Sequence, residues 1–288
     1  MTPSPLSSPP GDEGGDFFCR FPDSHAHLDM EDFDADREDV LKRAAAAGVE
    51  AVLVPIDIAS ERSRRIALGL AAAHGEIRTA AGLHPHQAKA WTPAMADALS
   101  GLAGDGSIVA VGEIGLDYHY DLSPRDDQRR AFAAQLALAE SLGLPVLIHS
   151  RLAGADIRAA IDAEKFSRGG ILHCFTEDGP FASAMLDRGF LISFSGILTF
   201  PSAERLRRVA AGVPLDRLLI ETDAPYLAPV PYRGRVKRNE PAFAAATLRF
   251  LAGLRGLDPA DLAAVLRRNY DGFLTARSAG SGTAPAAV

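Results

Sequence analysis

The sequence predicts an α/β protein built as a single (β/α)8 TIM barrel, and three observations lead to this prediction. Eight short apolar runs alternate with stretches that have the composition of helices. Most of the runs are continuously apolar rather than alternating, which is typical of parallel strands buried on both faces. Each strand and helix together occupy roughly 25 to 35 residues, and eight such units favour a closed barrel over an open sheet. The Rossmann alternative lacks its G-x-G-x-x-G fingerprint.

The expected strands can be read in chain order from the apolar runs. They are FFCRFPDSH (17–25), VEAVLVPI (49–56), IRTAAGLH (77–84), IVAVGEIG (108–115), LPVLIHS (144–150), GGILHCF (169–175), FLISFSG (190–196) and RLLIETD (217–223). Helical composition covers residues 43–48, 63–75, 129–143 and 202–212, and several of these stretches end in Gly, as helix C-caps do. A final helix, 257–276, begins with Asp258 as its cap and Pro259 at its first position.

The folded part is expected to span residues 17–277 as one domain. The chain has 288 residues, of which 47% are hydrophobic, and α/β barrels commonly reach about 250 residues as one unit. Residues 1–16 are mostly Pro, Ser, Gly and acidic side chains, and residues 278–288 are mostly small. Such segments cannot bury a core, so both are expected to be disordered tails.

Composition favours a cytoplasmic protein. Cys19 and Cys174 are too few for a disulfide framework, and neither a leader pattern nor an apolar span of about 20 residues is evident. We therefore expect no membrane association, and nothing implies an obligate protein partner.

The net charge of −7 argues against a polyanionic partner, but a basic loop contains Arg233, Arg235, Lys237 and Arg238. A nucleic-acid partner therefore stays open.

Residues with metal-binding side chains stand at the ends of five predicted strands. His25 and His27 are two residues apart, so both point to one face of the first strand. The other strand ends carry Glu113, His149, His173 and Asp223. In a barrel these ends meet at one mouth. Six ligands suit two divalent ions better than one tetrahedral ion, and one carboxylate would have to bridge them.

The motifs SHAHLD, GLHPH, GEIGLDY, IHSR, HCF and ETDAPYLAP, in this order, resemble the TatD family of metal-dependent deoxyribonucleases in the amidohydrolase superfamily. The resemblance covers about residues 21 to 275. It implies the same six metal ligands, with Glu113 as the bridge, and places His84 in the active-site cleft. It also implies hydrolysis of DNA phosphodiester bonds from a chain end, with RNA as a further possible substrate. The chain departs from the family pattern at Leu152, where Asp is usual, and in a 233–241 segment about two residues longer.

Two divalent ions imply a water-activating mechanism, because a metal lowers the pKa of bound water from ~15.7 towards 7. Asp223 is the best candidate to accept the proton of the attacking water. Glu221 could share that catalytic role or could orient a ligand histidine. His84 and Arg151 could hold phosphate oxygens, although Arg151 could instead pair with a structural carboxylate. The ions could be Mg, Mn or Zn, and four histidines favour the transition metals.

Other residues near these motifs receive lesser roles. Cys174 should point away from His173 as a buried apolar thiol. The residues His74, His86 and His119 are expected on loops or the surface. The fourth loop carries Asp117, Tyr118 and Tyr120, where a base could stack on an aromatic ring.

Two other function classes use the same features. An amide, ester or lactone hydrolase could be built on the same barrel, with a substrate carboxylate on the basic loop. A non-catalytic metal-binding protein would hold metal without turnover. The strand-end carboxylate available for proton transfer counts against the non-catalytic metal-binding protein. For the nuclease, Arg235 and Lys237 are the expected contacts to substrate phosphates.

Overall fold

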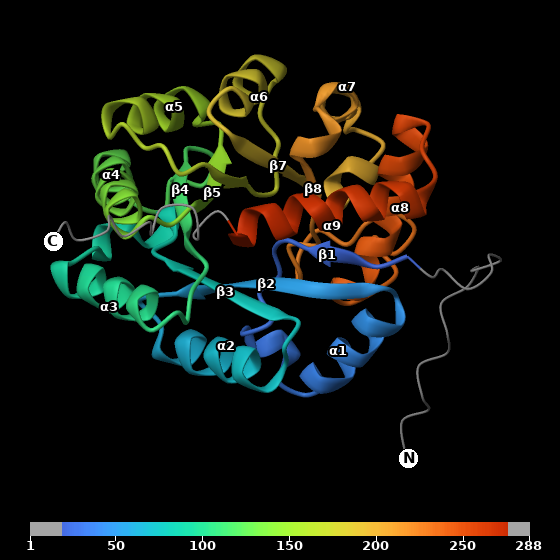
Figure 1. Cartoon of the computed structure of the whole chain (residues 1–288), viewed down its shortest axis with the longest axis horizontal. Coiled ribbons are helices and arrows are strands. Elements are labelled where there is room, and N and C mark those ends of the chain that lie inside the picture. The colour runs from blue at the N-terminus through green and yellow to red at the C-terminus, as the bar shows by residue number, and fades with distance from the viewer. Residues whose placement is uncertain (1–18, 276–288) are drawn as a thin grey trace, which may run out of the picture.

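The eight predicted strands form one closed parallel sheet. A computed structural model describes residues 19–275 (Figure 1), so the proposed tails at 1–16 and 278–288, and the domain limits at 17 and 277, lie outside the described residues. The strands pair in sequence order from β1 to β8. Their bounds are β1 Phe21–Asp23, β2 Val49–Asp57, β3 Ile77–Gly82, β4 Ala110–Asp117, β5 Val146–Arg151, β6 Gly170–Leu172, β7 Phe190–Phe194 and β8 Leu218–Ile220. The predicted (β/α)8 fold is confirmed.

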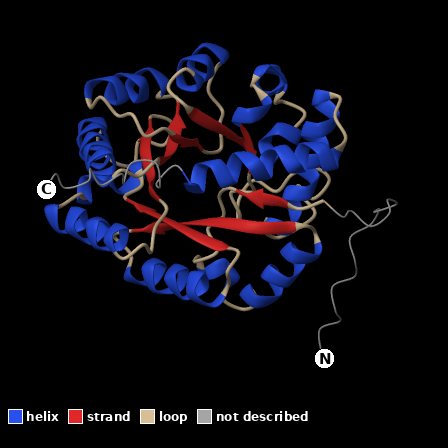
Figure 2. Ribbon diagram, viewed as in Figure 1, coloured by secondary structure: helices blue, strands red, loops and turns tan. Residues whose placement is uncertain are grey.

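Helices surround the sheet, as Figure 2 shows. Their bounds are α1 Arg37–Ala46, α2 Glu61–Ala73, α3 Pro93–Gly104, α4 Arg125–Leu142, α5 Gly154–Ala163, α6 Gly179–Leu186, α7 Glu204–Gly212, α8 Ala244–Arg255 and α9 Pro259–Thr275. All five predicted helical stretches overlap a helix. The Asp258 cap is also present, since Asp258 Oδ1 accepts a hydrogen bond from the Ala260 N–H at 2.7 Å. No helix among residues 19–275 is both long and apolar enough to cross a membrane.

The barrel closes where β8 meets β1. The Ser24 N–H donates to the Ile220 carbonyl at 3.0 Å, and the Asp223 N–H donates to the His25 carbonyl at 2.9 Å. The buried Asp23 carboxylate reinforces this seam, because it accepts bonds from both the N–H and the hydroxyl of Thr222, at 2.9 and 2.6 Å. The seam therefore fixes the two chain segments that carry His25 and Asp223.

One end of the barrel is plugged and the other is open. Side chains from seven strands form a layer inside the barrel: Leu53, Ala80, Ala110, Leu147, Ile171, Leu191 and Leu219. Tyr270 and Phe273 of α9 pack against this layer, and α9 runs across the barrel in Figure 1. Burying large aromatic side chains here removes apolar surface from water at one end. Polar chemistry is thereby left to the opposite end, where the strands have their carboxyl termini.

Candidate metal centre and active-site cleft

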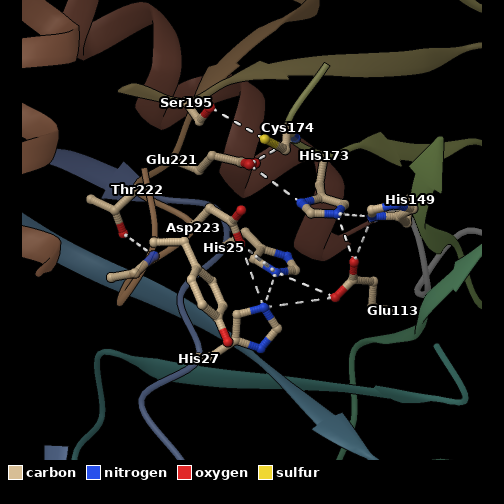
Figure 3. A network of polar contacts seen from close by, with 12 residues as sticks. His25, His27, Glu113, His149, His173, Cys174, Ser195, Glu221, Thr222 and Asp223 are labelled. Carbon is tan, nitrogen blue, oxygen red and sulfur yellow. Dashed lines mark hydrogen bonds and ion pairs between the residues drawn. The ribbon is translucent and has the colours of Figure 1, made fainter. Parts of the chain in front are cut away.

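The predicted ligands meet at the open mouth of the barrel. His25 and His27 follow β1, Glu113 lies in β4, and His149 lies in β5. His173 directly follows β6, and Asp223 follows β8. Figure 3 shows these six side chains turned toward one another. All except the fully buried His25 line a cleft of about 620 Å³.

Glu113 lies at the centre of this group. Its Oε1 atom faces the ring nitrogens of His84, His149 and His173 at 3.2, 3.1 and 2.7 Å. Its Oε2 atom faces the Nε2 atoms of His25 and His27 at 3.5 and 3.8 Å. The two oxygens of one carboxylate are therefore directed at two separate sets of imidazoles (Figure 3).

Asp223 completes the set on the His25 side. Its Oδ1 atom lies 3.6 Å from His25 Nε2 and 3.5 Å from His27 Nε2. Three groups of ligand atoms are close enough to hold a cation: His25, His27 and Glu113; His25, His173 and Asp223; His84, Glu113 and His149. Glu113 belongs to two of these groups, so the geometry suits ions on both sides of its carboxylate.

The spacing of the donor atoms fits a metal ion. The Nε2 atoms of His25 and His27 lie 3.1 Å apart. Two nitrogen ligands of one tetrahedral ion, each bonded at about 2.0 Å, are about 3.3 Å apart. Without a cation the two lone pairs would repel each other unless a proton lay between them. Imidazole nitrogens together with carboxylate oxygens are a donor set that Zn and Mn accept.

The pKa values of the cluster shift in both directions. Burial would raise the pKa of Glu113, but the neighbouring histidines outweigh it, and the pKa falls well below its usual range. Burial lowers the pKa of His25 strongly and lowers that of His84 to about 4, which favours their neutral forms. Burial also acts to lower the pKa of His27, His149 and His173, but the carboxylates beside them outweigh it and raise the pKa of each. A cation bound at these three rings would therefore take the place of a proton.

Buried carboxylates contact two of the histidines at the ring nitrogen that does not face Glu113. His149 Nε2 lies 3.0 Å from Asp117 Oδ2, and His173 Nδ1 lies 3.3 Å from Glu221 Oε1. Each contact fixes a ring so that its other nitrogen faces Glu113. Glu221 is fully buried, so this geometry favours the orienting role over a catalytic one.

Sequence reasoning missed the role of Asp117. It was placed on a loop, whereas it ends β4 and is fully buried. The same carboxylate also accepts a hydrogen bond from His86 Nε2 at 3.0 Å. Glu113 and Asp117 are four residues apart on one strand, and that even spacing was the available signal. His86 likewise lines the cleft, so its assignment as a loop or surface residue without a place in the site was incomplete.

Strained backbone accompanies the site. Asp223 and Cys174 have φ angles of 56° and 43°, in the left-handed region that side chains rarely adopt. Such strain persists where surrounding contacts hold a functional side chain in place.

The prediction that Cys174 is a buried apolar thiol was wrong about its burial and its surroundings. Cys174 is half-buried, follows the last residue of β6 by two, and places its Sγ atom 3.3 Å from the Ser195 hydroxyl.

The predicted phosphate contacts differ in their positions. Arg151 lines the cleft and stacks over the Tyr120 ring, 4.9 Å from its centroid. Among residues 19–275 no ion pair joins Arg151 to a carboxylate, and its phosphate-binding role stays a prediction. Arg235 and Lys237 are exposed and do not line the cleft. The other two cations of the basic loop are engaged: Arg233 stacks on Phe200, and Arg238 pairs with Asp36 at 2.6 Å.

Comparison with known proteins agrees with this centre. A family model described as TatD related DNase matches residues 22–275. This chain belongs to the TatD-related DNase family. The TatD resemblance drawn from its motifs is therefore confirmed, and the chain is a hydrolase of the TatD type.

The matches with individual TatD relatives span nearly the full length of those relatives. The chain is 42% identical over 253 residues to the uncharacterized metal-dependent hydrolase YcfH of Escherichia coli strain K12, which covers 86% of this chain and 93% of YcfH. It is 38% identical to the 3′-5′ ssDNA/RNA exonuclease TatD of Salmonella typhimurium, over 86% of this chain and 96% of that protein. The crystal structure of YJJV, a TatD homologue from Escherichia coli K12, superposes with a TM-score of 0.82 at 32% identity. That match covers 88% of this chain and 98% of YJJV.

Proposed function

We propose that this TatD-family hydrolase cleaves the phosphodiester bonds of single-stranded DNA or RNA from the 3′ end. The observation that carries the proposal is Glu113, whose two oxygens face separate sets of imidazoles at the bottom of an open cleft. A phosphodiester in hydrolysis gains negative charge on several oxygens, and a centre whose residues would hold cations on both sides of one carboxylate suits it. The name of the Salmonella relative supports the substrate and the polarity.

Two divalent ions, Mg, Mn or Zn, are proposed as the cofactor. His25, His27 and Asp223 would hold one ion, His149 and His173 the other, and Glu113 both. When bound, such ions lower the pKa of a water and neutralise charge on the phosphate. The imidazole-rich donor set supports Mn or Zn more than Mg.

The proposed roles of the side chains follow from their positions. Asp223 lines the cleft and accepts the proton of the attacking water. His84 and Arg151, also in the cleft, hold phosphate oxygens, Arg151 through its guanidinium fork. Asp117 and Glu221 hold the rings of His149 and His173 in position.

No observation favours the amide, ester or lactone alternative. Arg151 lines the cleft and is paired with no carboxylate within the described part of the chain, residues 19–275, which suits an anionic substrate; the family match supports a nuclease. A cytoplasmic location is proposed as well, supported by the two free cysteines.

The test is the pattern of products from a single-stranded oligonucleotide labelled at its 5′ end, with Mn²⁺ present. We expect a ladder that shortens one nucleotide at a time from the 3′ end. A duplex of the same sequence and a panel of neutral esters and lactones serve as comparison substrates. Internal cleavage would overturn action from a chain end, early release of the labelled 5′ nucleotide would overturn the polarity, and turnover of the esters alone would overturn the nuclease assignment.

A further inference from the structure

We propose that Tyr120 and Tyr226 form a nucleobase-binding subsite, in which unpaired bases stack on the two rings at opposite sides of the hydrolytic centre. This inference rests on the proposed nuclease function and names the part of the substrate that the protein recognises. The side chains around Glu113 would act on the phosphate alone, a group that nucleic acids share with other phosphodiesters.

Exposed apolar side chains gather at the mouth of the barrel. Among residues 19–275 the large hydrophobic side chains classed as exposed are Tyr120, Leu122, Leu152, Tyr226 and Val230. All five lie in loops that follow the carboxyl ends of β4, β5 or β8. Single exposed apolar residues need no explanation, but their restriction to the loops around one cleft indicates a binding surface.

The two tyrosines stand on opposite sides of the cleft. Tyr120 follows β4 and Tyr226 follows β8. The strands pair in order from β1 to β8 and the sheet closes, so β4 and β8 are diametrically opposed in the barrel. Both tyrosines line the same cleft as His27, Glu113 and Asp223.

Each ring is held against the site and keeps exposed surface. Tyr120 is 53% exposed, packs edge-on against His86 with centroids 5.6 Å apart, and carries the Arg151 guanidinium over one face. Tyr226 is 50% exposed and packs edge-on against His27 with centroids 6.2 Å apart. Of the two tyrosines on the fourth loop, Tyr120 is the one that lines the cleft, and stacking of a base on it stays a prediction. Tyr118 instead packs partly buried between α4 and α5, donates to Asp156 at 2.6 Å and lies under Arg125.

Nucleobases are the ligands that this arrangement suits. A phosphate on Arg151 brings the base of the same strand beside the Tyr120 ring, because the guanidinium covers that ring at 4.9 Å. Stacking on aromatic rings is open to every base, so the subsite favours unpaired strands without selecting a sequence. Bases paired inside a duplex have no free faces to offer.

The test compares a single-stranded oligonucleotide with an abasic strand that has the same number of phosphates. Hydrolysis of both is measured with the Mn²⁺-loaded chain and with the Tyr120→Ala and Tyr226→Ala variants. Each variant should raise KM for the normal strand at least about fivefold more than KM for the abasic strand, with little change in kcat; any effect of Tyr120→Ala on Arg151 falls on both strands and cancels in this ratio. The Tyr→Phe variants should behave as the native chain, because they keep the ring.

Tyr118→Ala is the matched control, since Tyr118 is on the same loop but outside the cleft. Its ratio of KM values for the two strands should equal that of the native chain. Equal effects on both strands in the Tyr120 and Tyr226 variants, or no effect on either, would overturn the subsite while leaving the nuclease intact. If the native chain cleaved neither strand, the proposed function would fall, and the subsite with it.

Discussion

Glu113 is the residue on which the centre most depends, because its carboxylate touches ligands from four other strand ends and loops. Replacing it by Ala removes the group between the two sets of imidazoles. We expect Glu113→Ala to lose hydrolysis and to bind less metal, with the barrel still folded. Metal content by atomic emission and the circular dichroism spectrum check the two parts. Full metal content with full activity would contradict the bridging role.

A substitution of Asp223 can distinguish an effect on the chemical step from an effect on metal or substrate binding. Asp223→Asn keeps an oxygen that can bind a cation but removes the proton acceptor, so kcat should fall about 10²-fold or more. Metal content and KM for the oligonucleotide should change much less. Steady-state kinetics of the metal-loaded variant provide the measurement. A variant with nearly native kcat would show that another group accepts the proton.

At the scale of elements, the basic loop between β8 and α8 is anchored to α1 and its entry. Arg238 pairs with Asp36 at 2.6 and 2.7 Å, and Arg43 bonds to both oxygens of Glu240 at 2.8 and 2.7 Å. The guanidinium of Arg238 also lies over the Phe33 ring. Arg238 therefore holds the loop in place, while Arg235 and Lys237 are left exposed.

This anchor makes stability depend on pH. Burial acts to raise the pKa of Asp36, but Arg238 and Arg43 outweigh it and lower the pKa. The unfolded chain then binds more protons than the folded chain near the ordinary Asp pKa of about 3.9, so the stabilisation is present above that pH and is lost as pH falls through the lowered pKa. Native Asp36 should be more stable than Asp36→Asn in urea unfolding at pH 7, and the difference should shrink below about pH 4. A difference that did not vary between pH 7 and pH 3.5 would contradict this account.

The exposed cations of the same loop should contribute to substrate binding through charge. Arg235→Ala/Lys237→Ala should raise KM for single-stranded DNA and flatten its salt dependence by up to about 0.7 log unit per lost contact. The kcat should change little, because neither residue lines the cleft. Arg168→Ala/Arg188→Ala is a control of equal charge, on the segments that enter β6 and β7 at the far end of the barrel. Identical salt slopes for both double variants would mean that the loop does not hold nucleic acid.

For the whole molecule, the barrel and the ligand positions could be predicted from the sequence because each strand and the ligand at its end lie within one short stretch of residues. An apolar run ended by His, Glu or Asp identifies a buried strand and its side chain at the mouth without knowledge of the neighbours. The contacts it could not predict join distant segments. Asp36 and Arg238 are 202 residues apart in the chain, and the Asp117 contacts with His149 and His86 depend on how loops and strands meet. Nor could local pattern show that Tyr226 faces the cleft while Tyr118 does not.

We expect the cluster around Glu113 to hold divalent metal and, with it, to hydrolyse single-stranded nucleic acid. The most direct test strips the purified chain with a chelator, measures bound metal, and assays a 5′-labelled single strand before and after adding Mn²⁺, Mg²⁺ or Zn²⁺. We expect no cleavage by the stripped chain, and recovery that follows metal content in the native chain but not in Glu113→Ala. Cleavage that persisted after stripping, or that Glu113→Ala recovered equally well, would contradict this expectation.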